Sequence, residues 1–507
     1  MKTATDRTAN HFAKAERLPL DDEFGAPLVE KSALFCLIIA IIILAFSAAS
    51  VIARVDSPED SSLIASSPNI NAGRAVTFNN RAYFVVDDGV HGEELWSSDG
   101  TDGGTFLLRD INPGPLGSGV RNLTVAGAQL FFSANDGAHG FELWRTDGTP
   151  QGTVLVKDIA PGADSSMPDS FAVINNVLLF AATHPTTGRE LWRSDGTSAN
   201  TTLIVDLFRG NAGSEPLELT AVGNTVFFSA AVPQSSGKHR STNIGRELWK
   251  TDGTAAGTSL VKDIWQGFGS SAPSKFVALG NSVFFTASTS DLGTELWRSD
   301  GSSAGTVLVK DITPGFAGSL FGHMRTYNGR LYFNVNAQFW KSDGTAQGTT
   351  PATDFAPGIS ESNFISADFA VLGSRAVFTV MTPSALELWV TDGTAVGTKF
   401  LRSRIPNDQI FIEVPLVSLA TGNLVFFDAF DPTTGTELYA TDGTPVGTRL
   451  VRDFFPNQSE PFVTPLFLTG VNGAALFSAD EGISGRELWI SRGTPGDPRI
   501  VHDFLTD

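Results

Sequence analysis

Short apolar runs separated by glycine-rich polar stretches follow one another from about residue 68 to the end of the chain. Examples are residues 130–132 (Leu-Phe-Phe), 283–285 (Val-Phe-Phe) and 425–427 (Val-Phe-Phe). These runs do not alternate apolar with polar residues, so we expect strands that are covered on both faces. Turn-forming pairs such as Gly280-Asn281 separate the runs. The pattern predicts an all-β region built from stacked sheets.

An eighteen-residue phrase recurs nine times in this region, and its clearest copy is ELWRSDGSSAGTVLVKDI at residues 295–312. ELWRS contains a large aromatic residue and no helical period, which predicts a strand. Asp-Gly predicts a tight turn, because aspartate can bond its own backbone and glycine adopts positive φ. TVLVKDI is rich in β-branched residues and predicts the returning strand. An apolar run and a shorter strand, such as residues 275–279, precede each copy, which makes about four strands per unit.

The third position of the phrase is aromatic in every copy and sets the spacing. The interval is 48 residues three times and 57, 43, 49, 50 and 50 residues elsewhere. Four-stranded units of ~40–50 residues with an aromatic signature are typical of propeller blades. We therefore predict a β-propeller of nine repeats over residues 68–507. A ring of eight blades with a degenerate sixth unit is the alternative, because propellers usually have ~4–8 blades.

Residues that recur in every unit are most simply structural, since a catalytic site needs a few groups that converge once. The Glu of ELW and the Asp of DGT are therefore expected to serve strand pairing and turn bonding, and we predict no catalytic residue. The structural aromatic residues are Trp96, Trp144, Trp192, Trp249, Trp297, Trp340, Trp389, Tyr439 and Trp489. The structural aspartates are Asp99, Asp147, Asp195, Asp252, Asp300, Asp343, Asp392 and Asp442.

The repeated phrase resembles that of the bacterial ELWxxDGT repeat proteins, over roughly residues 68–507. The resemblance implies a secreted or surface-displayed bacterial protein with propeller-like repeats, and it brings no established activity or site residues. The Asp-Gly turn is also similar to the Asp-box of sialidase propellers, where the motif is structural. Four copies depart from the pattern. The third has Asn200 in place of the second glycine and the ninth has Arg492 in place of the aspartate. The sixth lacks Glu-Leu and a Val-rich returning strand, and the seventh ends in residues 402–404 (Arg-Ser-Arg) where others have Asp.

The N-terminal part of the chain differs from the repeats. Residues 1–31 are polar and mixed in charge, and residues 32–53 carry no charge. Such a run is long enough to cross a bilayer as a helix, so we predict a transmembrane signal anchor, with a long signal peptide as the alternative. Basic residues before the run and acidic residues after it place the N-terminus in the cytoplasm and the repeats outside. Residues 54–67 are predicted to be a linker.

The charge and the cysteine count of the chain bear on its binding partners, disulfide bonds and cofactors. The net charge of −19 disfavours nucleic acid and anionic membrane surfaces. The single cysteine, Cys36, lies in the apolar run, so no disulfide can form within the chain. We predict no cofactor. Calcium could screen the charge, although no acidic cluster has EF-hand or nonapeptide spacing.

The sequence contains few candidates for catalytic or metal-binding residues. His91 and His139 occupy the same loop of consecutive units, beside Asp88 and Asp136, and these four residues are the weak candidates for a metal site. Inherited loop sequence is the simpler reason for their spacing. An insertion at residues 233–243 is basic and is predicted to be a solvated loop, or else a loop that binds a partner. A Gly-x-Ser-x-Gly elbow and zinc-ligand spacings are absent from the sequence.

The functional expectation is a non-catalytic, extracytoplasmic scaffold that binds protein or glycan at the cell surface. The alternatives are a secreted or anchored carbohydrate-active enzyme with a site in the propeller channel, and a structural component of the envelope. A cluster of non-repeated carboxylates and arginines at one channel mouth would favour the enzyme, whereas an exposed aromatic or loop-rich rim would favour binding.

Overall fold

A computed structural model describes residues 69–504 except 234–242, 268, 337, 353–363, 383–384, 407–417, 422, 432, 455–464 and 482–484. Residues 65–507 form one compact unit. The predicted transmembrane segment, its flanking tail and linker, Cys36 and most of the basic insertion lie outside the described residues. Within the described part, no helix has the length and apolar character needed to cross a membrane.

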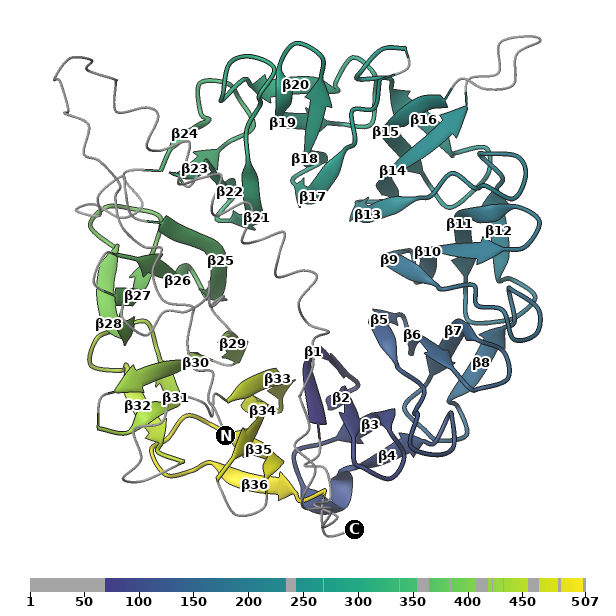
Figure 1. Ribbon diagram of the computed structural model, residues 1–507. Coiled ribbons are helices and arrows are strands. Elements are labelled where there is room, and N and C mark those ends of the chain that lie inside the picture. The colour runs from purple at the N-terminus through teal and green to yellow at the C-terminus, as the bar shows by residue number, and fades with distance from the viewer. Residues whose placement is uncertain are drawn as a thin grey trace, which may run out of the picture. The chain divides into compact units, whose positions relative to one another are not determined.

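The described residues form nine antiparallel sheets of four strands each, in which the chain visits the strands in order (Figure 1). The first four blades are β1 (Asn69–Phe78), β2 (Arg81–Asp87), β3 (Glu93–Ser98), η1, a 3-10 turn (Asp102–Gly104), and β4 (Phe106–Arg109); β5 (Arg121–Ala126), β6 (Gln129–Asn135), β7 (Phe141–Thr146) and β8 (Val154–Lys157); β9 (Asp169–Ile174), β10 (Val177–His184), β11 (Gly188–Ser194) and β12 (Thr202–Val205); β13 (Leu217–Val222), β14 (Thr225–Pro233), β15 (Asn243–Thr251) and β16 (Ser259–Lys262).

The remaining five blades repeat this order. They are β17 (Ser274–Leu279), β18 (Ser282–Thr289), β19 (Gly293–Ser299) and β20 (Val307–Lys310); β21 (Phe321–Tyr327), β22 (Arg330–Val335), β23 (Gln338–Ser342) and β24 (Thr350–Pro351); β25 (Phe364–Leu372), β26 (Arg375–Met381), β27 (Ala385–Thr391) and β28 (Lys399–Pro406); β29 (Ser418–Thr421), β30 (Leu424–Asp431), β31 (Gly435–Thr441) and β32 (Arg449–Arg452); and β33 (Leu466–Val471), β34 (Ala474–Asp480), β35 (Arg486–Ser491) and β36 (Arg499–His502).

The first strand of each blade packs against the first strands of its two neighbours, and β1 packs against β33, which closes the ring (Figure 1). The protein is therefore a β-propeller of nine four-stranded blades, and the prediction from the repeat is confirmed. The alternative with eight blades is wrong. Although β24 has only two residues, the sixth unit keeps its repeated turn, in which Ser342 Oγ and Thr349 Oγ1 lie 2.7 Å apart.

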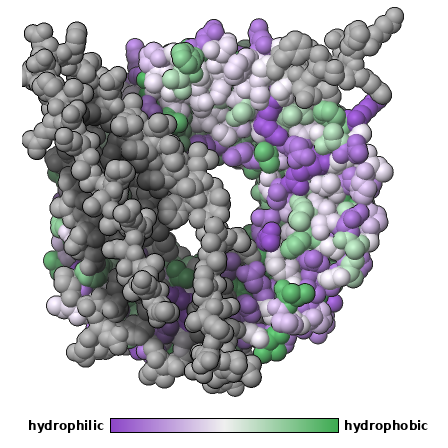
Figure 2. Space-filling model, viewed as in Figure 1, coloured by the Kyte–Doolittle hydropathy of each residue, from purple (hydrophilic) through white to green (hydrophobic). Residues whose placement is uncertain are grey.

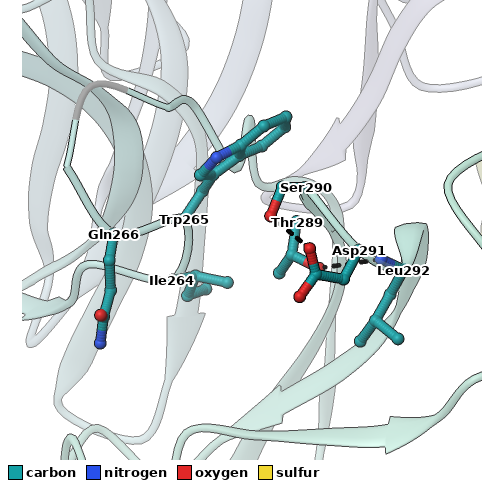
Figure 3. Close-up of a pocket in the computed structure, with 7 residues that line it drawn as sticks. All are labelled: Ile264, Trp265, Gln266, Thr289, Ser290, Asp291 and Leu292. Atoms are coloured by element: carbon teal, nitrogen blue, oxygen red, sulfur yellow. Dashed lines mark hydrogen bonds between the residues drawn. The ribbon is translucent and has the colours of Figure 1, made fainter.

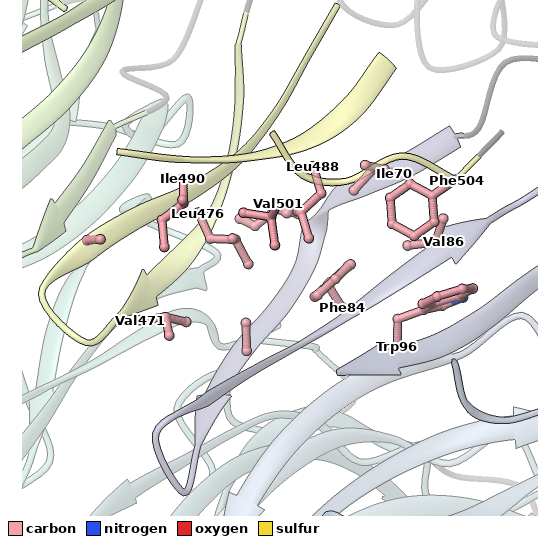
Figure 4. Close-up of a cluster of buried hydrophobic side chains, with 13 residues drawn as sticks. Ile70, Phe84, Val86, Trp96, Val471, Leu476, Leu488, Ile490, Val501 and Phe504 are labelled. Atoms are coloured by element: carbon pink, nitrogen blue, oxygen red, sulfur yellow. The ribbon is translucent and has the colours of Figure 1, made fainter. Parts of the chain in front are cut away.

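The hydrophobic core consists of nine clusters, one between each pair of neighbouring blades. The cluster at the seam joins Ile70, Phe84 and Trp96 of the first blade to Leu488 and Phe504 of the ninth (Figure 4). In each blade the aromatic residue of the phrase packs toward the preceding blade, while the residue before it packs toward the following one; that residue is Leu in eight blades and Phe339 in the sixth. Neighbouring side chains of a strand point to opposite faces, so Leu-Trp supplies both faces of a sheet at once. This explains the apolar runs without alternation.

The repeated Asp-Gly turn joins the third and fourth strands of each blade. In the second blade, Asp147 Oδ1 accepts hydrogen bonds from the amide and hydroxyl of Thr149, at 2.9 and 2.7 Å. A Cβ on Gly152 would lie 2.0 Å from the same carboxylate oxygen, so glycine is the residue that fits this position in the second blade. Two blades whose phrase lacks one of these residues form the turn by other contacts. In the third blade, Asn200 stands in place of the second glycine, and its Nδ2 donates to Asp195 at 2.7 Å. In the ninth blade, Arg492 stands in place of the aspartate, and Asp497 supplies a carboxylate that accepts the amide of Arg492 at 2.8 Å.

Candidate functional site: one face of the ring and its pocket

Two sets of loops form one face of the ring, which we call the crossover face. They are the loops between the second and third strands of a blade and the crossover loops that lead from its fourth strand to the next blade. These loops touch closely: a Cβ on Gly92 would lie 2.4 Å from the amide nitrogen of Gly117, and one on Gly293 would lie 2.4 Å from that of Gly318. The Asp-Gly turns lie at the opposite ends of the strands, and we call that side the turn face.

Buried glutamates of the phrase hold the crossover loops in place. Glu247 accepts hydrogen bonds from Ile264 N at 2.8 Å, Ser271 N at 2.9 Å and Ser271 Oγ at 2.5 Å. The equivalent glutamate holds the crossover loop of five other blades, through Glu94, Glu142, Glu190, Glu295 and Glu437. In the ninth blade, Glu487 accepts the amide of Phe504, in the segment that follows β36. The side chain of this glutamate therefore anchors a loop, whereas we expected it to serve strand pairing.

Burial changes the ionisation of these glutamates. It raises the pKa of Glu94, Glu247 and Glu487 to about 7 and that of Glu190 to about 6, because a charged carboxylate loses its water. Hydrogen bonds from serine hydroxyls and backbone amides oppose this shift in Glu94, Glu190 and Glu247. Since the same arrangement recurs around the ring, these raised pKa values belong to the framework of the crossover face.

The weak metal candidates each bond within their own loop. His91 Nδ1 lies 2.7 Å from Asp88 Oδ2, and His139 Nδ1 lies 2.7 Å from Asp136 Oδ2. The two aspartates also accept the backbone amides of their own turns. No group of three or more metal-ligating side chains gathers among the residues that the structure describes. Each histidine–aspartate pair helps to shape its own loop, and a metal site at these residues stays a prediction.

Charged residues that are not part of the repeat meet between the third and fourth blades. Arg189, whose side chain is 11% exposed, pairs with Asp169 and lies 3.6 Å from Glu215, while Arg246 donates to the Glu215 carbonyl at 2.6 Å. Hydrophilic residues also border the central opening next to β9 and β13 (Figure 2). Because Arg189 further donates to the Met167 carbonyl at 3.0 Å, its contacts fasten successive crossover loops to each other.

A pocket of ≈ 400 Å³ opens on the crossover face between the fourth and fifth blades (Figure 3). One wall is the crossover loop after β16, with Ile264, Trp265 and Gln266, and the other is the turn between β18 and β19, residues 289–292. Figure 3 shows the indole of Trp265 on one side and the side chains of Ser290 and Asp291 on the other.

Both walls of this pocket are held in place. Glu247 accepts the amide of Ile264, next to Trp265, and a Cβ on Gly269 would lie 2.0 Å from the Trp265 ring, so the loop packs directly on the indole. Ser290 Oγ donates to Asp291 Oδ1 at 2.7 Å, and Leu292 N donates to Thr289 Oγ1 at 3.3 Å. The pocket therefore presents a fixed aromatic ring and an exposed carboxylate across one space.

The pocket was not predicted from the sequence, although the sequence contains a signal of it. The chain has nine tryptophans, eight of which occupy the third position of the phrase, and Trp265 is the ninth. The corresponding residues in the preceding crossover loops are Asn112, Ala160 and Phe208. This position varies between units, and Trp265 is the one tryptophan of the sequence that lies outside the phrase.

Comparisons with known proteins add little to this geometry. No family model and no curated protein matches the chain. Among solved structures, the chain is similar to puromycin hydrolase (14% identity, TM-score 0.38), to a puromycin-hydrolysing peptidase of Mycobacterium tuberculosis (11%, 0.38) and to a prolyl endopeptidase (10%, 0.39). The similarity covers 71–74% of this chain and only 54–58% of theirs.

These similarities correct the functional expectation. We expected a non-catalytic scaffold that binds protein or glycan, yet the solved structures that the chain resembles are those of peptidases, so a non-catalytic role is not supported. They assign no activity to this chain, because identities of 10–14% and TM-scores below 0.5 carry only a coarse likeness. The resemblance to ELWxxDGT repeat proteins stays a prediction.

Proposed function

We propose that this propeller binds a small organic cation in the pocket between its fourth and fifth blades. The observation that carries the proposal is the pairing of Trp265 with Asp291 across a pocket of ≈ 400 Å³, formed by loops whose sequence varies between units. A pocket of this size is in the range of small-molecule sites, ~300–1,000 Å³.

The two side chains favour a cation by different means. The face of an indole attracts a positive charge with roughly 0.5–2 kcal/mol, and it favours cations whose hydration is weak, such as quaternary ammonium groups. A carboxylate across the pocket adds charge attraction, and Ser290 keeps that carboxylate oriented. The net charge of −19 raises the local concentration of cations around the whole ring.

Calorimetric titration of the full-length protein with choline tests the proposal, with 3,3-dimethylbutanol as the neutral analogue of the same shape. We expect saturable binding of choline that weakens with added salt, and little binding of the analogue. Trp265→Leu keeps an apolar side chain but removes the indole, and should weaken binding roughly 2- to 30-fold. Asp291→Asn keeps the shape but removes the charge, and should also weaken it.

A matched control is available on the same face. Asp164 is exposed in the crossover loop of the second blade, so Asp164→Asn removes one charge from the crossover face without touching the pocket. This variant should bind choline as the wild type does. Equal binding of choline and its neutral analogue, or equal losses in the Asp164 and Asp291 variants, would refute the proposal. Analysis of the ligand after incubation shows directly whether the bound cation is also chemically changed.

A further inference from the structure

Apolar side chains protrude from the tips of the crossover loops. Leu116 is 90% exposed, Phe316 is 85% exposed and Leu320 is 71% exposed. Single exposed apolar residues are common on protein surfaces. In this ring, however, six of the ten large apolar side chains that are exposed in the described part of the chain belong to the crossover face. They are Val90, Leu116, Met167, Leu217, Phe316 and Leu320.

The protruding side chains stand on a rigid base. Gly117, next to Leu116, packs against the backbone of Glu93, and Ser118 N donates to the Glu93 carbonyl at 3.0 Å. In the fifth blade the amide of Ser319, next to Leu320, donates to the Thr294 carbonyl at 2.8 Å. Because backbone contacts fix these loops, the apolar tips cannot fold back onto the ring without breaking hydrogen bonds.

Two of the tips lie beside the pocket. A Cβ on Gly293 would lie 2.7 Å from the Phe316 carbonyl oxygen, and Gly293 is two residues after Asp291. The crossover loop that carries Phe316 and Leu320 therefore packs against the turn that supplies the carboxylate. A surface that received these apolar tips would meet the mouth of the pocket at the same time.

The chain enters the ring on this face. Asn69, the first residue of β1, pairs with Asp87, the last residue of β2. The loop that follows Asp87 contains Gly92, which packs against the first crossover loop. The apolar run predicted to cross a membrane ends at Ala53, and the residues 54–68 that follow it can span at most roughly 50 Å. A bilayer that holds the run is thus within reach of the crossover face.

We infer that the crossover face lies on a lipid bilayer, with Phe316, Leu320 and Leu116 in its apolar layer and the ammonium head group of a zwitterionic lipid in the pocket. The inference rests on the proposed function for its head-group part and on the exposed tips for its bilayer part. The negative charge of the protein disfavours anionic lipids, whereas a choline or ethanolamine group presents its cation outward. Weak insertion suffices, because a tether makes the contact intramolecular.

An environment-sensitive fluorophore tests this arrangement in the full-length protein in phosphatidylcholine vesicles. Cys36→Ser removes the native thiol, and Ala317→Cys places the label beside Phe316 while leaving that side chain intact. Val446→Cys is the matched control, since Val446 is 95% exposed in a turn of the opposite face. We expect the emission of the label at 317 to shift to the blue and to be quenched by spin-labelled lipid. The label at 446 should be quenched only by a quencher dissolved in the water.

Three comparisons separate the parts of the inference. Phe316→Ser with Leu320→Ser should reduce the blue shift at 317, and phosphatidylglycerol vesicles should give a smaller shift than phosphatidylcholine. If the labels at 317 and 446 behave alike, the bilayer contact is refuted, even where soluble choline still binds and the proposed function stands. If the label at 317 is inserted but Asp291→Asn changes neither the shift nor choline binding, the head-group part and the proposed function are refuted together.

Discussion

Glu247→Ala tests how the crossover loops are held. Glu247 is 1% exposed and accepts the amides of Ile264 and Ser271 at 2.8 and 2.9 Å, together with the Ser271 hydroxyl. Alanine leaves both amides without this acceptor, and each buried unsatisfied donor costs ~1–3 kcal/mol. The hydroxyl can turn to the Arg246 carbonyl at 3.4 Å, so we leave it out of the sum. We expect the free energy of unfolding to fall by about 2–6 kcal/mol, the sum for the two amides.

Urea denaturation measures this loss, and amide hydrogen exchange locates it. Exchange should accelerate first at Ile264 and Ser271, because their amides lose their partner. Glu387 is the matched control: it occupies the same position of the phrase but accepts the Trp389 indole N–H at 2.9 Å and is only half-buried. Glu387→Ala should cost ~0.5–1.5 kcal/mol. A loss in Glu247→Ala no larger than in Glu387→Ala would refute the reasoning.

Three further predictions concern the framework. Burial raises the pKa of Glu94, Glu247 and Glu487 from 4.5 to about 7, so between these pH values the folded ring binds more protons than the unfolded chain. The stability that this gives is complete below pH ~4.5 and is lost as the pH rises through 7. The thermal midpoint should therefore fall as the pH rises, and it should fall less in Glu247→Gln. Gly152→Ala should cost ~1–3 kcal/mol, because its Cβ would meet Asp147 at 2.0 Å, whereas Gly103→Ala, with nothing within 4 Å, should lie within ~0.5 kcal/mol of the wild type by urea denaturation. Trp489→Ala should cost about 3–5 kcal/mol in the same assay, because its side chain is 1% exposed; a loss below ~1 kcal/mol would contradict the packing between blades.

The repeat made the fold predictable from one sequence. Leu-Trp places apolar side chains on both faces of one strand, and a sheet covered on both faces needs neighbours on both sides. Nine copies of the phrase therefore imply nine blades. The sixth blade was the uncertain unit because its returning strand is weak in the sequence, and β24 is indeed reduced to Thr350–Pro351. The sixth blade still forms because its turn makes the usual hydrogen bonds, in which Asp343 Oδ1 accepts from Thr345 N at 2.9 Å.

Contacts between loops were not predictable in the same way. The repeated glutamate bonds a serine 24 residues later, and the sequence held an unused signal of this contact. A serine stands at that spacing in each of the first five units, although the rest of the loop varies: Ser118, Ser166, Ser214, Ser271 and Ser319. The pocket depends on two adjacent blades. Trp265 stands out in the sequence as the tryptophan outside the phrase, but the sequence does not show that Asp291 lies across from it. Repetition identifies what every blade shares, whereas a binding site arises where one pair of blades differs from the rest.

The most direct test of the proposed function is an experimental structure of the full-length protein with tetramethylammonium bound. The account predicts density for the cation between the Trp265 ring and the Asp291 carboxylate, and its loss in Asp291→Asn. Density at another blade, or an empty pocket at a concentration where calorimetry shows saturation, would contradict it.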